Sequence, residues 1–383
     1  MNKRHIATMT LPLHNNYGGL LQAFALQHVI QELGHETKLI RNDLRHYPLW
    51  KKRFHFLKHC IKKVVFKTPI LVPDFTTKEQ KKIIAKNSES FIEKNINTTS
   101  LVKNVFSFND IKNYNFDGFV VGSDQVWRTD YSANIVNYFF EFLDSKPNMT
   151  RVSYAASFGI DEWTFSDEET QKCKKLISNF HSVSVREESA VELCKIHLAI
   201  DAERVLDPTF LVQTGVYREL VDKANLQSPE GKIFSYVLDR SDSNKKIERE
   251  ASQKLNTKHF TIMPRKDLEN LNSENIDEFV YPAVENWING FIQADYVITD
   301  SFHGTVFAIL FNKKFISIGN RRRGLSRFVS ILSLFGLESR LVTDYNDFSV
   351  DKLTNDIDWN YINKILSIEQ EHSKQFLKNS LDY

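Results

Sequence analysis

A polar turn between two apolar runs, close to the C-terminal end of the chain, constrains the fold more than any other segment. The turn is residues 299–304 (TDSFHG); apolar residues precede it at 296–298 (YVI) and follow it at 306–311 (VFAILF). This order predicts a strand, a turn and a helix. In open parallel sheets ligands bind where strands end, because helix N-termini there offer unpaired amides to an anion. The turn combines an acid, hydroxyl groups and an imidazole, so we predict that it belongs to a functional site.

The alternation of strands and helices recurs along the chain in two series. The first has predicted strands at 6–11, 36–41, 116–121, 152–156, 183–185 and 205–206, with helices at 20–33, 167–178 and 189–197. The second has predicted strands at 233–238, 260–263, 296–299 and 315–318, with helices at 244–255, 284–294, 302–311 and 325–335. Such alternation is typical of parallel sheets. The sequence therefore predicts an α/β protein with two Rossmann-like domains and a cleft between them.

The predicted domain boundaries follow from these two series. Residues 1–224 are expected to form an N-terminal Rossmann-like domain, interrupted by a mostly helical insertion at about 44–104. A polar stretch at 225–231 starts a second domain, which extends to residue 360. Residues 361–383 are predicted to be a helical tail that packs across the interface. A chain of 383 residues is long enough for two domains, each with its own core.

Composition narrows the class of partner. The chain has 50 Lys and Arg against 48 Asp and Glu, which argues against nucleic acid as a main partner. Its cysteines, Cys60, Cys173 and Cys194, lack metal-ligand spacing, so we predict no disulfide framework and no structural zinc. The N-terminus lacks the apolar core of a signal peptide, and no run of about 18 apolar residues is present. We therefore expect a cytoplasmic protein.

One segment, which begins at Trp50 and ends at Lys67, is both basic and amphipathic. Its apolar residues recur at helical spacing, and Lys and Arg occupy most of the other positions. Such a helix can lie on an anionic membrane, or it can pack on the domain with a solvated basic face. A location at the inner face of the membrane is therefore one of two interpretations.

Further polar turns follow predicted strands in the first series. Residues 16–19 (NYGG) have small side chains, which allow a ligand close to the backbone or simply form a tight turn. Residues 122–127 (GSDQVW) carry an acid that can accept a proton from a sugar hydroxyl and an aromatic ring that can stack on a sugar. Ser and Asp also cap helices, which is the alternative interpretation of this turn.

Two arginines at predicted element ends are candidates for binding an anion. Arg186 in residues 184–187 (SVRE) ends a strand, where it can bind a carboxylate or phosphate bidentately or pair with the following helix. Arg327 lies on a predicted helix that follows the triplet Arg321, Arg322 and Arg323, which is either a phosphate-binding or an exposed basic loop. Two more strand ends are small or acidic: residues 153–159 (SYAASFG) allow close packing, and Asp207 in 206–208 (LDP) can cap a turn.

The six motifs at 16–26, 122–127, 153–159, 184–187, 206–208 and 299–304, in this order and spacing, resemble the polysaccharide pyruvyl transferase family from the first strand to about Leu337. The resemblance implies a GT-B-like fold and a transferase that forms a pyruvate ketal with release of phosphate. It implies phosphoenolpyruvate as donor and a sugar of a capsular or other surface polysaccharide, or its lipid-linked oligosaccharide precursor, as acceptor. No cofactor and no metal are expected.

Carried onto this chain, the resemblance makes Arg186 and His303 the donor-binding Arg and His. Ser301 lies two positions before His303, where the family often has Arg or Ser, so the donor's remaining positive contact is expected from Arg327. His303 is the predicted acid, with Asp124 or Asp300 as base, and Asp300 can also orient His303. The predicted donor-binding residues are Arg186 in the first domain and Ser301, His303, Gly304 and Arg327 in the second, which is the expected donor side. The predicted acceptor-binding residues are Asn16, Tyr17, Gly18, Gly19, Gln125 and Trp127, on the side of the first domain.

Two other functions fit the same residues. One is a GT-B glycosyltransferase, because the same cleft and basic strand ends can hold the diphosphate of a nucleotide sugar. The other is a non-catalytic module that binds glycan or lipid-linked oligosaccharide through Trp127 and the basic helix. Only pyruvyl transfer would release phosphate from phosphoenolpyruvate without a nucleotide.

Overall fold

The computed structural model describes residues 3–43, 77–103, 107–132, 134–224, 226–265, 273–319 and 324–382. Three features predicted from the sequence therefore lie outside the described residues: the basic segment from Trp50 to Lys67, Cys60, and the triplet Arg321 to Arg323. Of the predicted insertion, the described part begins at residue 77.

The first half of the chain forms a six-stranded sheet in the order β2-β1-β5-β6-β7-β8, and every pair in it is parallel. Its strands are β1 (His5–Met9), β2 (Glu36–Leu39), β5 (Gly118–Val121), β6 (Thr150–Ala156), β7 (Ser182–Val185) and β8 (Glu203–Arg204). Its helices are α1 (Tyr17–Glu32), α5 (Asp167–Ile177), α6 (Glu188–Leu193) with a π-helical continuation (Cys194–Leu198), and α7 (Thr214–Asp222). Strands β5 and β6 are buried along their whole length, and β5 accordingly has only apolar residues and glycine.

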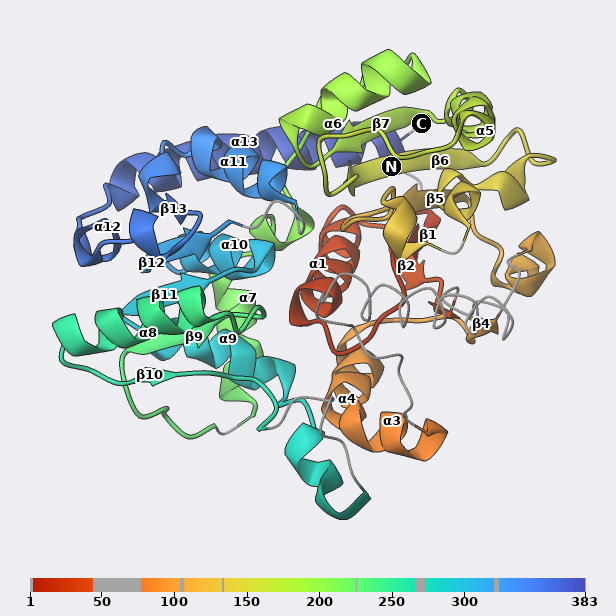
Figure 1. The fold of residues 1–383 in the computed structure, drawn as a ribbon. Coiled ribbons are helices and arrows are strands. Elements are labelled where there is room, and N and C mark those ends of the chain that lie inside the picture. Colours follow the sequence, from red (N-terminus) through yellow and green to blue (C-terminus); the bar gives the residue numbers. More distant parts are fainter. Residues whose placement is uncertain are drawn as a thin grey trace, which may run out of the picture.

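The second half forms a five-stranded parallel sheet in the order β10-β9-β11-β12-β13. Its strands are β9 (Ile233–Tyr236), β10 (His259–Phe260), β11 (Tyr296–Thr299), β12 (Lys314–Ile318) and β13 (Leu341–Val342). Its helices are α8 (Asp242–Lys254), α9 (Val284–Gln293), α10 (Phe302–Leu310), α11 (Leu325–Leu334) and α12 (Val350–Thr354). Two parallel sheets flanked by helices (Figure 1) confirm the predicted α/β class with two Rossmann-like units.

The described part of the insertion is helical, as the sequence predicted. It contains α3 (Lys78–Ile84) and α4 (Lys86–Asn95), and a short parallel pair, β3 (Asn42–Asp43) and β4 (Val102–Lys103), flanks it. Thr77 caps α3 in a capping box with Gln80, which fixes where this helix begins. Short 3-10 helices cover Phe108–Asp110, Lys112–Tyr114, Thr129–Tyr131, Ile135–Phe139, Glu141–Leu143, Pro208–Phe210, Ser273–Phe279, Glu338–Arg340 and Tyr345–Asp347.

The last helix, α13 (Trp359–Leu381), follows the second sheet in sequence but packs against the first (Figure 1). The Ser373 hydroxyl accepts a hydrogen bond from the Leu206 amide (3.0 Å), and the Leu381 carbonyl accepts one from the Arg4 guanidinium (2.7 Å). The C-terminal end of the chain is therefore fastened to the sheet that contains its N-terminal strand. The domain boundaries themselves stay predictions.

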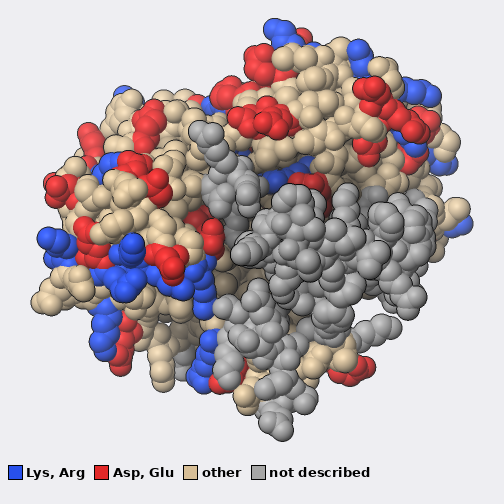
Figure 2. All heavy atoms as spheres, in the orientation of Figure 1, with Lys and Arg blue, Asp and Glu red and all other residues tan. Residues whose placement is uncertain are grey.

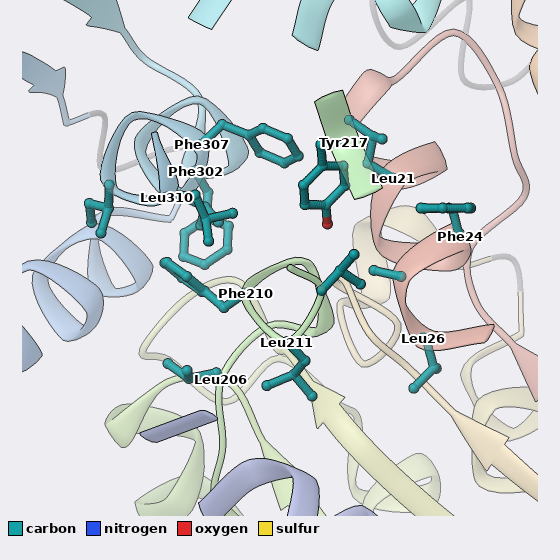
Figure 3. Packing of buried hydrophobic residues seen from close by; sticks show 14 of the residues in the cluster. Leu21, Phe24, Leu26, Leu206, Phe210, Leu211, Tyr217, Phe302, Phe307 and Leu310 are labelled. Carbon is teal, nitrogen blue, oxygen red and sulfur yellow. The ribbon is translucent and has the colours of Figure 1, made fainter. Parts of the chain in front are cut away.

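A continuous apolar core joins the two halves of the protein. Leu21 and Phe24 of α1, Tyr217 of α7 and Phe307 of α10 belong to one cluster of buried side chains, which Figure 3 shows between the red and the cyan helices. Helices α1 and α10 begin at the carboxyl ends of β1 and β11. Because apolar burial holds the two helices together, it also fixes the distance between their polar N-terminal ends.

Candidate active site

A pocket of about 760 Å³ lies where the N-terminal ends of α1 and α10 meet the loop after β5. Its walls come from both halves of the protein, and the residues that line it are mostly polar. The lining residues are Thr10, Leu11, Pro12, Leu13, His14, Asn16, Gly19, Gln22, Asp124, Gln125, Asp130, Tyr131, Leu238, Asp300, Ser301, Phe302, His303 and Arg327. The polar turns that the sequence predicted to be functional are therefore brought together at one place.

Arg186 lies beneath this pocket, directly after β7, and is only 6% exposed. Its Nη1 donates a hydrogen bond to Asp207 Oδ2 (2.8 Å), and its Nη2 lies 3.6 Å from Asp124 Oδ1. Burial by itself lowers the pKa of Arg186, but the carboxylates of Asp207, Asp124 and Glu187 outweigh burial and raise it. Among the described residues, Nε and Nη2 make no hydrogen bond. The guanidinium is thus charged, and two of its nitrogens are buried without a hydrogen bond from the described residues.

Asp207 is the carboxylate that links the two halves of the site. Its Oδ1 accepts hydrogen bonds from the amide (3.0 Å) and the hydroxyl (2.7 Å) of Thr209. Its Oδ2 accepts from Arg186 and lies 3.5 Å from Nε2 of His303. Burial alone would raise the pKa of Asp207, but His303, Arg186 and Thr209 hold it well below its ordinary value. Asp207 therefore carries a negative charge under the imidazole.

His303 lies in the first turn of α10, which Ser301 caps through a hydrogen bond from the Gly304 amide (3.4 Å). The imidazole is buried, and among the described residues its Nε2 has no hydrogen-bond partner. Gly18, in the first turn of α1, lies against the imidazole: a Cβ at Gly18 would be 2.1 Å from Nδ1 and 2.8 Å from the Cβ of His303. The NYGG turn therefore provides the space that His303 occupies.

This contact leads to a matched pair of alanine substitutions. Gly18→Ala is expected to displace the imidazole, to cost about 1–3 kcal/mol of stability, and to lower turnover by about 100-fold or more, because such sites tolerate little misplacement. Gly215, in the first turn of α7, has no atom within 4 Å of an added Cβ. Gly215→Ala should leave turnover unchanged and raise stability slightly. Equal turnover by Gly18→Ala and Gly215→Ala would contradict the role given to the contact between Gly18 and His303.

The lowered pKa of Asp207 also predicts a pH dependence of stability. Because the folded-state pKa lies below the ordinary value of 3.8, the unfolded chain binds a proton that the folded protein excludes, and the free energy of unfolding falls as the pH falls. Asp207→Asn lacks this contribution. The free energy of unfolding of Asp207→Asn should be lower than that of wild type, and this difference, measured by chemical denaturation, should shrink as the pH is lowered from about 5 to about 3. The exposed Asp161→Asn is the control; a deficit of Asp207→Asn that stays constant with pH would contradict the assignment.

Two buried guanidinium groups lie over the ring of Phe302 at the pocket. The Cζ of Arg186 lies 4.3 Å from the centre of this ring, and that of Arg327 lies 5.6 Å away. Arg327 is 7% exposed; burial and the charge of Arg186 lower its pKa to about 10. Both arginines are therefore charged at neutral pH. Two cations this close repel each other, and an anion in the pocket would relieve that repulsion.

Backbone packing between the two halves holds Arg327 in place. Glu187 Oε1 accepts hydrogen bonds from the hydroxyl of Ser157 (2.8 Å) and from the amides of Phe158 (3.1 Å) and Gly159 (3.3 Å). The carbonyl of Gly159 in turn abuts Gly324, the residue before α11, where an added Cβ would lie 1.9 Å from that oxygen. The lack of a side chain at Gly324 thus permits the start of α11, with Arg327, to approach the SYAASFG segment of the first half.

The two other predicted acids differ in their surroundings. Asp124 lies in the pocket in a left-handed conformation (φ 71°), which Asp adopts more readily than most residues. Asp300 also lines the pocket, but its two carboxylate oxygens accept hydrogen bonds from the amides of Leu238 (2.7 Å) and Asp239 (2.8 Å). The carboxylate at ion-pair distance from His303 is that of Asp207; the orienting role of Asp300 stays a prediction.

The structure corrects two of the predicted acceptor contacts. Trp127 is 0% exposed: it stacks on Phe139 at a centroid distance of 5.0 Å and cannot lie against a sugar. Tyr17 is also completely buried, and its hydroxyl donates to the carbonyl of Pro282 (2.9 Å) between the two halves. Both aromatic rings are core residues. Tertiary packing, which a short motif does not encode, decides their burial.

The remaining predicted residues lie at or beside the pocket. Asn16, Gly19, Gln125 and Ser301 line it, and Gly304 is buried in α10 against Thr299. The sequence motifs did not single out Phe302, Asp130 or Tyr131 as site residues, and Asp207 was interpreted only as a turn cap. Asp207 does cap the 3-10 helix Pro208–Phe210. Its position at the end of a strand was the available signal for a second role.

The charged side chains of the described residues are mixed in sign, in line with the similar numbers of basic and acidic residues in the sequence. Figure 2 shows Lys, Arg, Asp and Glu side by side on one face, without a single sign covering the part that is drawn in colour.

Within the described ranges, no three His, Cys, Asp or Glu side chains are grouped to hold a metal ion. Likewise, none of the helices in those ranges is long and apolar enough to cross a membrane.

Comparison with solved structures shows what the fold is similar to. The chain aligns with Arabidopsis thaliana UGT89C1 complexed with UDP-L-rhamnose at a TM-score of 0.52 and 10% identity, over 99% of each chain. Other similar structures are Acinetobacter baumannii MurG (TM-score 0.44, 8% identity, 98% of each chain) and Neisseria meningitidis UDP-GlcNAc 2-epimerase bound to UDP-GlcNAc (TM-score 0.45, 9% identity, 98% of this chain and 94% of that one). At these identities the likeness shows the fold alone. A search of curated proteins found no match.

The fold and the site together define a GT-B-like α/β protein with a pocket between its two Rossmann-like units. Residues 16–322 match the sequence family described as polysaccharide pyruvyl transferase. The protein belongs to the polysaccharide pyruvyl transferase family. Family membership confirms the resemblance found in the motifs, and it supports a transferase that acts in polysaccharide pyruvylation.

Proposed function

We propose that this protein transfers the pyruvyl group of phosphoenolpyruvate to two hydroxyls of a sugar, forming a ketal and releasing phosphate. The observation that carries the proposal is the pair of buried guanidiniums, Arg186 and Arg327, that both lie over the ring of Phe302, which also contacts the imidazole of His303. The cluster of Arg186, Arg327 and His303 suits a small anion with a double bond that an acid can protonate. The sugar belongs to a surface polysaccharide or to its lipid-linked precursor.

Phosphoenolpyruvate matches the charges of the pocket. Its carboxylate and phosphate are both anions that guanidinium groups bind with charge-assisted hydrogen bonds. Two nitrogens of Arg186 make no hydrogen bond among the described residues. Bound phosphoenolpyruvate would supply a shared counter-charge to the neighbouring guanidinium groups of Arg186 and Arg327. Ser301 and the N-terminal amides of α10 add further donors for an anion.

The reaction needs an acid to protonate the methylene carbon of phosphoenolpyruvate. His303, whose Nε2 lies 3.5 Å from the buried carboxylate of Asp207, supplies this proton. A sugar hydroxyl then attacks C2, and its proton passes to Asp124, which lines the pocket and lies near Arg186. The bond from C2 to the phosphate oxygen breaks, and phosphate leaves with the proton that Asp124 had accepted. A second hydroxyl closes the ketal, and its proton restores the imidazolium.

A lipid-linked acceptor would place the reaction at the inner face of the membrane. The basic segment from Trp50 to Lys67, which would provide the membrane contact, lies outside the described residues. Membrane contact and a cytoplasmic location therefore stay predictions from the sequence.

The test is incubation of the purified protein with phosphoenolpyruvate and a panel of oligosaccharide and lipid-linked acceptors. We expect phosphate release only when an acceptor is present, together with an acceptor mass gain equal to pyruvic acid less one water. Added nucleotides and chelators should not change the rate. Transfer of a hexose from a nucleotide sugar, with no consumption of phosphoenolpyruvate, would overturn the proposal.

A further inference from the structure

The pocket contains a second group of residues that the donor chemistry does not use. Gln125, Asp130 and Tyr131 come from the loop that follows β5 and from the 3-10 helix Thr129–Tyr131, and all three line the pocket. Asp130 is an exposed carboxylate, with 70% of its side-chain surface accessible. This group therefore combines an amide, a carboxylate and an aromatic ring beside the guanidinium cluster.

Arg128 holds the ring of Tyr131 in a defined position. Its guanidinium carbon lies 4.7 Å from the centre of that ring, on one of its faces. Arg128 is buried, and its Nη1 donates to Gln125 Oε1 (3.0 Å) while Nε and Nη2 each approach Asp130 Oδ2 (3.4 Å). The three pocket residues are thus fixed by one cation. A ring that is ordered before the ligand arrives loses little entropy on binding.

Tyr131 has surface left for a ligand. One face of its ring meets Arg128, and the side chain is only partly buried in the pocket wall. Tyr131 lines the pocket together with the polar side chains of Gln125 and Asp130. A tyrosine of this kind offers an apolar surface and a polar tip to one ligand.

The chemistry of these three residues fits a pyranose ring. A pyranose has an apolar face of C–H bonds, which packs on an aromatic ring, and an equatorial edge of hydroxyls, which donate to carboxylate and amide oxygens. We propose that Tyr131 is the platform for the acceptor's pyranose ring, and that Asp130 binds its hydroxyls. The inference rests on the proposed function and adds to it a residue that selects the acceptor. It replaces the stacking role that the buried Trp127 cannot perform.

The experiment compares wild type with Tyr131→Ala, Tyr131→Phe and a control, Tyr361→Ala, whose ring is exposed on α13. The probes are p-nitrophenyl hexopyranosides of gluco, galacto and manno configuration. Their binding is followed by saturation-transfer NMR with inorganic phosphate present and, separately, as KM in the phosphoenolpyruvate assay. We expect Tyr131→Ala to raise the glycoside Kd and KM about tenfold or more. Tyr361→Ala should remain near wild type, Tyr131→Phe, which keeps the ring, should bind the glycosides more tightly than Tyr131→Ala, and KM for phosphoenolpyruvate should not change.

Each outcome decides the matter. Glycoside binding by Tyr131→Ala equal to wild type would overturn the proposal, and so would the absence of binding of every probe by wild type. Loss of binding in Tyr131→Ala alone supports the platform even if wild type consumes no phosphoenolpyruvate; in that case only the proposed function fails. A rise in KM for both substrates would indicate general damage to the pocket and would also count against the platform.

Discussion

Replacement of His303 by alanine is expected to reduce kcat for phosphate release from phosphoenolpyruvate by roughly 10² to 10⁴-fold, which is the usual contribution of a general acid. Among the described residues with a printed distance to Asp207, His303 is the one whose side chain commonly acts as a general acid. The fold should persist, because α10 is held by apolar residues such as Val306 and Phe307, which are completely buried. The measurement is steady-state phosphate release at saturating acceptor, with circular dichroism as a check on folding.

The matched control for this variant is His372→Ala. His372 is half-exposed on α13, where its Nε2 pairs with Glu203 at 2.7 Å, and it is not among the pocket residues. It should retain wild-type kcat. His303→Gln, which keeps a polar side chain of similar size, should be as inactive as His303→Ala because glutamine does not donate a proton. Near-normal turnover in either His303 variant would remove His303 from the chemistry.

The second large effect is expected from Arg186. Arg186→Ala removes hydrogen bonds to the charged substrate phosphoenolpyruvate, so KM for this substrate should rise by roughly 10²-fold or more. It also leaves Asp207 and Asp124 without their buried cation, which costs about 3–5 kcal/mol of stability. Arg186→Lys retains the charge but loses the bidentate geometry, and it should separate the two effects by keeping most of the stability while still binding the donor poorly.

Arg151→Lys is the control for burial alone. Arg151 is as deeply buried as Arg186, but its Nη2 donates to the carbonyls of Leu143 and Lys146, and it does not line the pocket. We expect a loss of stability with unchanged KM for phosphoenolpyruvate. A KM that changes equally in Arg151→Lys and Arg186→Lys would show that the donor effect is a consequence of destabilisation, and Arg186 would then be a structural residue only.

Much of the fold and part of the site could be predicted because local rules dominate there. Strands buried on both faces give short apolar runs, and polar residues directly after them must gather at the carboxyl edge of a parallel sheet. This rule was sufficient to find Asp124, Arg186 and His303, and the structure places all three around one pocket.

The rest of the site depends on contacts between distant parts of the chain. The sequence shows that Asp207 can cap a turn, but not that its second oxygen faces Arg186 and His303 across the two halves. The same limit explains Trp127: the sequence shows an aromatic residue after an acidic turn, whereas the segment Ile135–Phe139 covers its ring. Gly18 was predicted as a ligand contact, and its tightest neighbour proves to be the imidazole of His303.

The central claim is that the guanidinium and imidazole groups of the pocket act on phosphoenolpyruvate to make a ketal. The most direct measurement uses phosphoenolpyruvate labelled with carbon-13 at C2 and follows the carbon spectrum in the presence of a sugar acceptor. The account predicts that wild type converts the enol signal into that of a quaternary ketal carbon attached to the sugar, in step with phosphate release, and that His303→Ala does not. Phosphate release that yields only free pyruvate, or an unchanged enol signal with every acceptor, would contradict it.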